Sequence, residues 1–177
     1  MKKKWLEIGG LVGGIILGFF GMLYGYPSLV FKVVEAAVSP GDNICYAAKL
    51  PSAESKVVVK PNPDFLYVTC HYNLDQGPLR LTGHLPDTSY WSLALYKPNT
   101  VNTAIINDRD LPQSNLELIL MEEGMPIPPK LPEGAMLLPS PSKTGLLLFR
   151  ILVSDPSSKN LQTLGAYQQS LQITHLQ

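Results

Sequence analysis

Cys70 and His71 are the first residues whose types could do chemistry, because a thiol beside an imidazole can act as a nucleophile with its base. They lie inside FLYVTCHY (65–72), a run rich in aromatic and β-branched residues that predicts a strand. Adjacent strand residues point to opposite faces, so the two side chains are not expected to meet or to share a metal. On the apolar face, Cys70 is expected to be a buried thiol. A disulfide with Cys45 in an oxidising periplasm is the alternative.

Two polar turns supply further candidates. Asn62 and Asp64 lie in a proline-flanked loop, and residues 107–110 read Asn-Asp-Arg-Asp. Hydrogen bonds from these side chains to their own backbone explain both turns, since Asn and Asp favour such bonds. A pocket that gathers the polar residues would instead favour catalysis. The candidate catalytic residues in that case are Asp64, Asp108, Arg109, Tyr67 and His71.

Arg150 is unusual because it interrupts the apolar run LLLFRILV (146–153). A buried guanidinium must be paired and hydrogen-bonded. We therefore expect a structural ion pair of Arg150 with Asp64 or Asp108. The alternative is an arginine near the strand end that extends its charged head to water.

The sequence offers no recognisable metal or cofactor motif. The three histidines (71, 84 and 175) are scattered and lack metal-ligand spacing. Neither a Gly-x-Ser-x-Gly nor an HExxH motif occurs, and no phosphate-binding glycine loop is present. We expect no metal and no cofactor. The sequence leaves open whether the protein is an enzyme and favours a protein that is not.

The elements that must position these residues are short strands. Apolar or alternating runs separated by turn residues occur at 56–60, 65–72, 78–85, 89–96, 101–107, 116–122, 135–139 and 145–153. About eight short strands at this spacing predict an all-β, jelly-roll-like sandwich. The residues expected to face inward are Trp91, Leu93, Leu95, Leu116, Leu118 and Cys70.

The last part of the chain changes to a helical period. Asp155 followed by Pro156 predicts a helix N-terminus, and leucines at 161, 164 and 171 continue with Tyr167 at helical spacing. The proline-rich stretch at 125–134 cannot be a central strand. We expect it to be a rigid connector, with a docking segment as the lesser alternative.

The N-terminal segment predicts a transmembrane helix. No charged residue occurs from Ile8 to Phe31, and an uncharged apolar run above about 18 residues can span a bilayer. Lys2, Lys3 and Lys4 precede it, which predicts a cytoplasmic N-terminus and an exported main domain. A signal peptide cleaved at residues 37–39 is the alternative.

Glycines recur along this helix at spacings of four, four, three and four residues, which places them in one stripe. Small residues let helices approach closely in lipid, so we expect the stripe to pack against a second copy or another protein. The stripe consists of Gly10, Gly14, Gly18, Gly21 and Gly25.

Charge and domain organisation narrow the function classes. After Phe20 the chain carries eleven basic and thirteen acidic residues, which argues against nucleic-acid binding because that requires a basic surface. We expect a cytoplasmic N-terminus (1–7), a transmembrane helix (8–27), a helical or irregular connector (28–54) and a periplasmic sandwich with its C-terminal helix (55–177).

Four stretches carry a resemblance to a known family. They are KPNPDFLYVTCHYNLDQGPLRL, YWSLALYKPNTVNTAIINDRD, LPEGAMLLPSPSKTGLLLFRILV and the short helix that follows. Together they resemble the bacterial domain-of-unknown-function family 1254 over residues 55–172, most closely its short membrane-anchored members. The resemblance implies a jelly-roll-type sandwich. Long members carry a second β-domain, family 1214, and we expect only the first domain in this sequence. A threonine common in the first motif is replaced by Phe65.

These features predict a binding and assembly protein of the bacterial inner membrane. Its partner is expected to act through the glycine stripe or the exposed sandwich, and a chain carrying the sister β-domain is the partner that the resemblance implies. The alternative is a periplasmic enzyme that acts on a small envelope-associated molecule. The activity, the ligand and the choice between homo- and hetero-oligomer are not set by the sequence.

Overall fold

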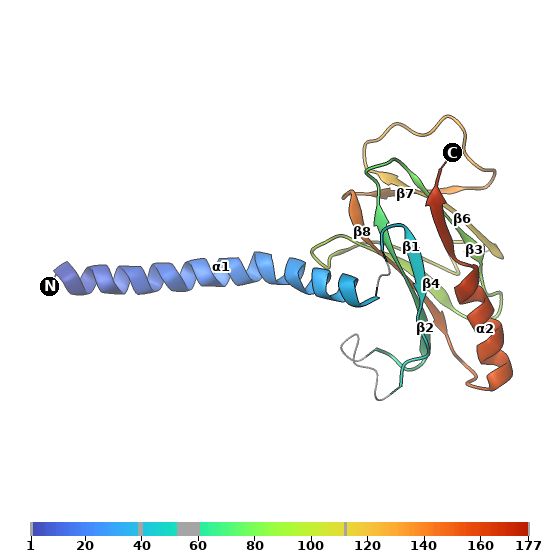
Figure 1. Cartoon of the computed structure of the whole chain (residues 1–177), viewed down its shortest axis with the longest axis horizontal. Helices are drawn as coiled ribbons and strands as arrows, with labels where there is room; N and C mark the ends of the chain where they lie inside the picture. Colours follow the sequence, from blue (N-terminus) through green and yellow to red (C-terminus); the bar gives the residue numbers. More distant parts are fainter. Residues whose placement is uncertain (1, 39–40, 53–60, 112, 177) are drawn as a thin grey trace.

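The computed structural model describes residues 2–38, 41–52, 61–111 and 113–176 (Figure 1). Within these residues two helices and nine strands form a long N-terminal helix and a mostly β, sandwich-like domain. The elements are α1 (Lys2–Val38), β1 (Ile44–Ala47), β2 (Phe65–Asn73), β3 (Leu79–His84), β4 (Trp91–Tyr96), β5 (Asn102–Asn107), β6 (Asn115–Glu122), β7 (Met136–Ser140), β8 (Thr144–Leu152), α2 (Ser158–Ser170) and β9 (Gln172–His175).

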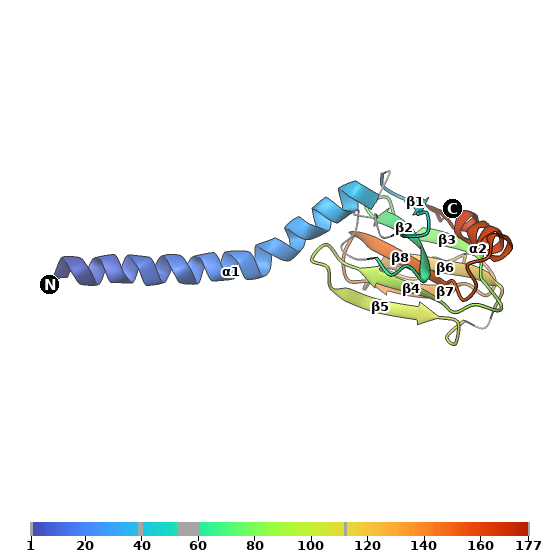
Figure 2. The same cartoon turned by 90° about the horizontal axis from the view of Figure 1, so that it is seen from below.

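Helix α1 is long and apolar enough to cross a membrane. Its 37 residues extend over about 55 Å, against about 30 Å for the hydrocarbon core of a bilayer. The helix projects from the domain, and its apolar part is not buried against the rest of the chain. Figure 2 shows a bend part-way along it, which Pro27 explains, since a proline inside a helix removes a backbone hydrogen bond. The helix does not end at the expected span (8–27) but continues to Val38.

The sandwich consists of a five-stranded sheet in the order β1-β2-β8-β4-β5 and a four-stranded sheet in the order β7-β6-β3-β9. Alternate side chains of both sheets meet in one core, where Trp91 stacks on Phe149. The six residues predicted to face inward are all buried members of this core. The seven predicted strands between 65 and 153 are also present, whereas the strand predicted at 56–60 lies outside the described residues.

A disulfide joins Cys45 to Cys70. The two residues lie directly opposite each other in the antiparallel pair of β1 with β2. The expectation of a free thiol at Cys70 is therefore wrong, although Cys70 is buried as expected. Reasoning from the sequence missed β1, and without that strand nothing placed Cys45 beside Cys70.

The proline-rich connector has a topological role. Strands β6 and β7 are parallel neighbours, and parallel neighbours cannot be joined by a tight hairpin, so the chain must cross back from one end of the sheet to the other. Residues 123–135 make this crossover without a helix or strand. Prolines suit this segment because it contributes no ladder hydrogen bonds to the sheet.

Helix α2 packs against β2 and β3, one strand from each sheet, and so covers one side of the sandwich (Figure 1). Buried Gln168 fixes it there by donating hydrogen bonds to the carbonyls of Ala48 and Tyr67. The helix begins later than predicted, because Ser157 is its N-cap. Asp155 instead accepts two hydrogen bonds from Ser157 and so holds the capping residue in place.

Candidate functional site

The five candidate catalytic residues are distributed over three places. Asp64 is exposed in the turn before β2, where its backbone N–H donates to the side chain of Asn62 at 2.9 Å. The Tyr67 hydroxyl accepts a hydrogen bond from the Asn62 N–H at 3.1 Å. This arrangement is the turn chemistry that the sequence indicates. It engages the Tyr67 hydroxyl locally rather than in a shared site.

The turn after β5 is also held by its own side chains. Arg109 donates its backbone N–H to the Asn107 side chain, and the Asn107 N–H donates to the Asp110 carboxylate. Arg109 is exposed. Asp108 differs from its neighbours because its Oδ1 is buried and has no hydrogen-bond partner among the described residues.

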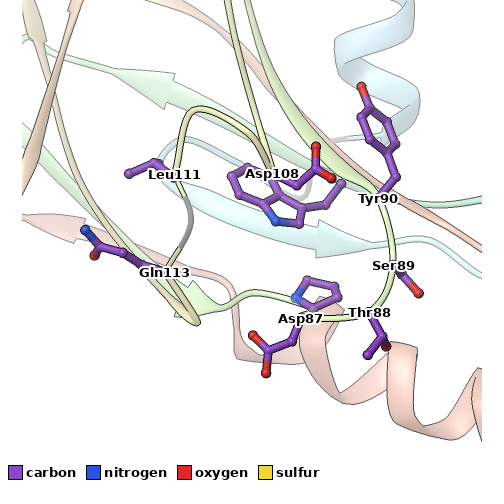
Figure 3. Close-up of a pocket in the computed structure, with 9 residues that line it drawn as sticks. Asp87, Thr88, Ser89, Tyr90, Asp108, Leu111 and Gln113 are labelled. Atoms are coloured by element: carbon purple, nitrogen blue, oxygen red, sulfur yellow. The ribbon is translucent and has the colours of Figure 1, made fainter.

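Asp108 lines a cavity of about 420 Å³ at one end of the sandwich. Figure 3 shows that two connections surround it, with Asp87 and Tyr90 contributed from one side and Asp108 and Gln113 from the other. These residues belong to the β3–β4 and β5–β6 connections. The buried ring of Trp91 also lines the cavity.

The described lining of this cavity combines two carboxylates with hydroxyl and amide groups. Among its described lining residues Asp87 and Asp108 are carboxylates, and none is a lysine, arginine, histidine or cysteine. Asp87 already accepts a hydrogen bond from Ser114 at 2.9 Å. The two carboxylates can accept hydrogen bonds from a ligand that carries N–H or O–H groups.

His71 lies apart from this cavity, on the outer face of β2. Its side chain is only 7% exposed, and it sits between two carboxylates. Nε2 lies 2.5 Å from Glu35 of α1, and Nδ1 lies 2.9 Å from Asp42 in the segment between α1 and β1. Cys70 and His71 thus serve different faces of one strand, as the alternation of the strand predicts.

Further contacts complete this joint between helix and sandwich. Thr69 donates its hydroxyl to the carbonyl of Val38 at 2.8 Å. The second oxygen of Asp42 accepts from the Asn73 amide at 2.9 Å. Phe31 and Val38 are buried, whereas most other described residues of α1 are exposed. We call this set (Phe31, Glu35, Val38, Asp42, Thr69 and His71) the helix–sandwich joint.

Arg150 makes neither of the two expected ion pairs. It is half-buried on the outer face of β8, where its Nε donates to Ser92 Oγ at 3.2 Å and its guanidinium lies 5.9 Å from the centre of the Phe65 ring. Throughout the described part of the chain no ion pair links it to Asp64 or Asp108. The neighbouring strands supply both partners, since Ser92 stands directly opposite Arg150 on β4 and Phe65 lies on β2, two residues from the register partner Tyr67.

Residues 2–38, 41–52, 61–111 and 113–176 contain no cluster of three or more His, Cys, Asp or Glu side chains that could hold a metal ion. His71 lies in the five-stranded sheet, whereas His84 of β3 and His175 of β9 lie in the four-stranded sheet. His84 bonds Asn115 of the neighbouring strand β6.

Sequence reasoning missed Glu35 and Asp42 in the joint and Asp87 in the cavity. A signal for the joint exists, since Phe31, Glu35 and Val38 follow one another at spacings of four and three and so share one helical face. No comparable signal marks Asp87, because only the fold brings its connection beside the one that holds Asp108.

Comparison with known families assigns the domain to a family. The family described as "Protein of unknown function (DUF1254)" matches residues 42–175. The chain belongs to the DUF1254 family. The match begins at Asp42 of the joint and covers the whole sandwich, so the resemblance noted in the sequence is confirmed.

Two solved structures share the fold of this DUF1254 chain. The VPA0106 protein from Vibrio parahaemolyticus superposes with a TM-score of 0.63 at 13% identity, over 88% of this chain and 37% of its own. An uncharacterized protein from Burkholderia cenocepacia gives 0.53 at 19% identity, over 85% and 40%. The chain thus spans about two-fifths of the length of these proteins. No protein with a curated description matches the sequence.

Proposed function

We propose that this DUF1254 protein is a single-pass protein of the bacterial inner membrane, whose periplasmic sandwich of jelly-roll type serves as a binding and assembly module in an envelope complex. The Cys45–Cys70 disulfide is the observation that supports a periplasmic location of the sandwich. Disulfides form and persist in oxidising compartments such as the periplasm and are rare in the cytosol. The lysines at positions 2–4 favour the matching orientation, with the N-terminus in the cytoplasm.

The joint supports a retained anchor over a cleaved signal peptide. Cleavage at residues 37–39 would remove Phe31 and Glu35 from the sandwich and would leave His71 with one carboxylate instead of two. A segment that packs into the folded domain in this way behaves as part of the mature protein.

An assembly role accounts for the positions of the five candidate residues and of the glycine stripe better than a catalytic role does. The alternative enzyme needs Asp64, Asp108, Arg109, Tyr67 and His71 to converge, but of these five only Asp108 lines the cavity. The glycine stripe of α1 meets nothing within 4 Å in the described part of the chain and is open to a partner helix. Because the joint holds the end of α1 on the sandwich, a partner bound in the membrane would meet the sandwich in a defined orientation.

The partner that we propose is a chain carrying the sister β-domain, or a second copy of this chain. The two solved structures contain about 60% of additional chain beside the part that matches this one. A chain with the sister β-domain bound to this sandwich would form a complex that resembles these longer chains in composition.

The location is tested with reporter fusions after Gln177. We expect a reporter that works only outside the cytoplasm to be active and one that works only inside it to be inactive. The reverse pattern would contradict the proposed orientation. Sequencing the N-terminus of the mature protein separates the two interpretations of α1, since a start near Ser39 would show cleavage.

The assembly role is tested by purifying the full chain in mild detergent at native expression level, followed by native mass spectrometry. We expect a stoichiometric complex that contains either a second copy or a protein with the additional β-domain. A monomer as the sole species, in detergents that preserve other inner-membrane complexes, would contradict an assembly role. Turnover of a small molecule that is lost in Asp108→Asn would favour the enzyme.

A further inference from the structure

The cavity at the end of the sandwich has an unbalanced charge. It has a volume of about 420 Å³. Asp87 stands on the β3–β4 connection and Asp108 on the β5–β6 connection (Figure 3). Both are carboxylates, and no described lining residue is a lysine, arginine or histidine. The hydroxyl and amide groups of the lining can donate or accept hydrogen bonds, so the carboxylates set the preference of the cavity for charge. A cavity lined by one sign of charge attracts the opposite sign.

The Asp108 carboxylate is held in place and yet has no partner. Its backbone N–H donates to the Trp91 carbonyl at 3.3 Å, and the side chains of Asn107 and Asp110 bond backbone groups of the same turn. The Oδ1 of Asp108 is buried without a donor from the described residues, and none of their cationic side chains forms an ion pair with it. Taking a carboxylate from water without such a partner is unfavourable. A cationic N–H donor in the cavity would offset that cost, because charge-assisted hydrogen bonds are the stronger kind.

The rest of the lining suits an organic molecule better than a bare ion. Pro86, Trp91 and Leu111 supply apolar and aromatic groups beside the carboxylates. The volume falls in the range of small-molecule sites, and a metal ion would fill only a small part of it. The part of the chain that the structure describes also holds no cluster of His, Cys, Asp or Glu side chains with metal-binding geometry.

We propose that this cavity binds a small organic cation, a molecule in which a protonated amine or a guanidinium is attached to an apolar body. The cationic group bonds the Asp108 carboxylate, and Asp87 adds a second negative charge. The apolar body lies against Leu111 and the Trp91 ring. The inference goes beyond the proposed assembly role and does not depend on it, because every residue it uses belongs to the sandwich itself.

The test follows the cavity by NMR in the full chain, labelled with ¹⁵N-tryptophan in detergent micelles. The chain has two tryptophans, Trp5 in α1 and Trp91 in the cavity, and the indole signal missing in Trp5→Phe belongs to Trp5. The probes have similar shapes and differ in charge: phenethylamine is a cation, 2-phenylethanol is neutral and phenylacetate is an anion. Because Trp5 is exposed on the apolar helix, its signal reports uptake of a probe by the micelle.

We expect the Trp91 signal to move saturably with phenethylamine and to stay in place with phenylacetate at the same concentrations. The neutral alcohol can still donate a hydrogen bond, but we expect it to bind about tenfold more weakly or worse, because it lacks the charge. Equal affinity for the amine and the alcohol would overturn the requirement for a cation. Saturable movement with calcium chloride, at an ionic strength where sodium chloride has no effect, would assign the cavity to a metal ion instead. No saturable movement with either phenethylamine or the guanidinium compound agmatine would also overturn the proposal.

Two variants assign the binding to the cavity. Asp108→Asn keeps the shape of the side chain and removes its charge, and we expect it to weaken phenethylamine binding by about tenfold or more. Asp110→Asn is the matched control, since Asp110 belongs to the same turn but bonds the Asn107 N–H and does not line the cavity. It should bind as the wild type does. Wild-type affinity in Asp108→Asn, or an equal loss in both variants, would overturn the assignment. Thermal unfolding of Asp108→Asn confirms that a loss of binding is not a loss of fold.

Discussion

At the scale of single residues, Gly145 shows why a side chain can be excluded from a core strand. A Cβ at this position would collide with the carbonyl of Tyr96 and the hydroxyl of Tyr72. Tyr72 cannot move aside easily, because it is fully buried and its hydroxyl is bonded to Ser140 at 2.9 Å. The absent side chain therefore lets two strands and a buried hydroxyl approach one another.

We expect Gly145→Ala to lower the free energy of unfolding by about 1–3 kcal/mol, the usual cost of overpacking a core. Gly165→Ala is the matched control, since Gly165 lies inside α2 and an added methyl group there would meet no described atom within 4 Å. That control should raise the free energy of unfolding by about 0.5–1 kcal/mol, because alanine is the better helix residue. Urea unfolding of both variants measures these changes. Equal urea midpoints for the two variants would refute the steric argument for Gly145.

Asp108 presents the opposite case, a polar group that is present where stability does not require it. Its buried Oδ1 lacks a partner in the described part of the chain, and burying a carboxylate oxygen without a donor is unfavourable. We expect Asp108→Asn to raise the free energy of unfolding by about 1 kcal/mol. Thermal unfolding measures the effect, with Asp110→Asn as the control, because its amide oxygen can still accept the hydrogen bond from the Asn107 N–H. A destabilised Asp108→Asn would show that this carboxylate supports the fold.

Residue types predicted local chemistry well and long-range partners poorly. The hydrogen bonds of Asn62 with Asp64, and the separation of Cys70 from His71, follow from neighbours in the chain. The partners of Arg150 and His71 do not, since Ser92 and Glu35 are brought there by strand order and by the docking of a helix.

At the scale of elements, the strands with clear apolar patterns were predictable and the two four-residue edge strands were not. Strands β1 and β9 have four residues each, lie at the edges of their sheets and expose most of their side chains. Their sequences therefore lack the alternation that marks a half-buried strand. Helix α1 continues through Pro27 to Val38, whereas the expected transmembrane helix ended at residue 27.

The start of α2 is an element whose stability should depend on pH. The pKa of Asp155 lies below its ordinary value of 3.8, because the Ser157 hydroxyl and then the Ser157 N–H donate hydrogen bonds to the carboxylate. The ionised form is thus favoured in the folded turn. Its contribution is fully present above the ordinary value and is lost as pH falls through the lowered pKa.

We expect the Ser157 amide signal to move, and exchange of the Asn160 amide proton to quicken, as the pH falls below 3.8. Asp155→Asn should show neither change, since its amide does not titrate. NMR of the wild type and the variant measures both quantities. A Ser157 signal that moves in the same way in the variant would assign the change to another group.

At the scale of the whole molecule, the apolar helix and the sandwich have separate surfaces for separate environments. The sandwich encloses its own core. Helix α1 exposes large apolar side chains and its glycines together, with nothing in the described part of the chain to cover them. The sequence predicted this division, because an uncharged run and a set of alternating strands require different surroundings.

We expect the double variant Gly14→Ile with Gly18→Ile to insert normally and to lose association with its partner. Isoleucine fills the groove that close helix packing needs while it keeps the segment apolar. The control pair Ile15→Leu with Phe19→Leu alters the exposed apolar side chains beside the stripe and should leave association unchanged. Yield of the complex in mild detergent measures the difference, and wild-type yield from both variants would show that the stripe is no interface.

Helix α1 runs as one helix from its apolar part into the joint. The number of residues between the apolar part and the joint therefore sets the rotation of the sandwich about the helix axis. One residue inserted between Pro27 and Phe31 would turn the sandwich by about 100° and move it about 1.5 Å outward. An insertion of about seven residues would return nearly the original bearing, since two helical turns differ from a heptad by only about 20°. A partner that binds both the helix and the sandwich depends on the orientation of one relative to the other. Such a partner should therefore still bind after the seven-residue insertion and should lose binding after the one-residue insertion.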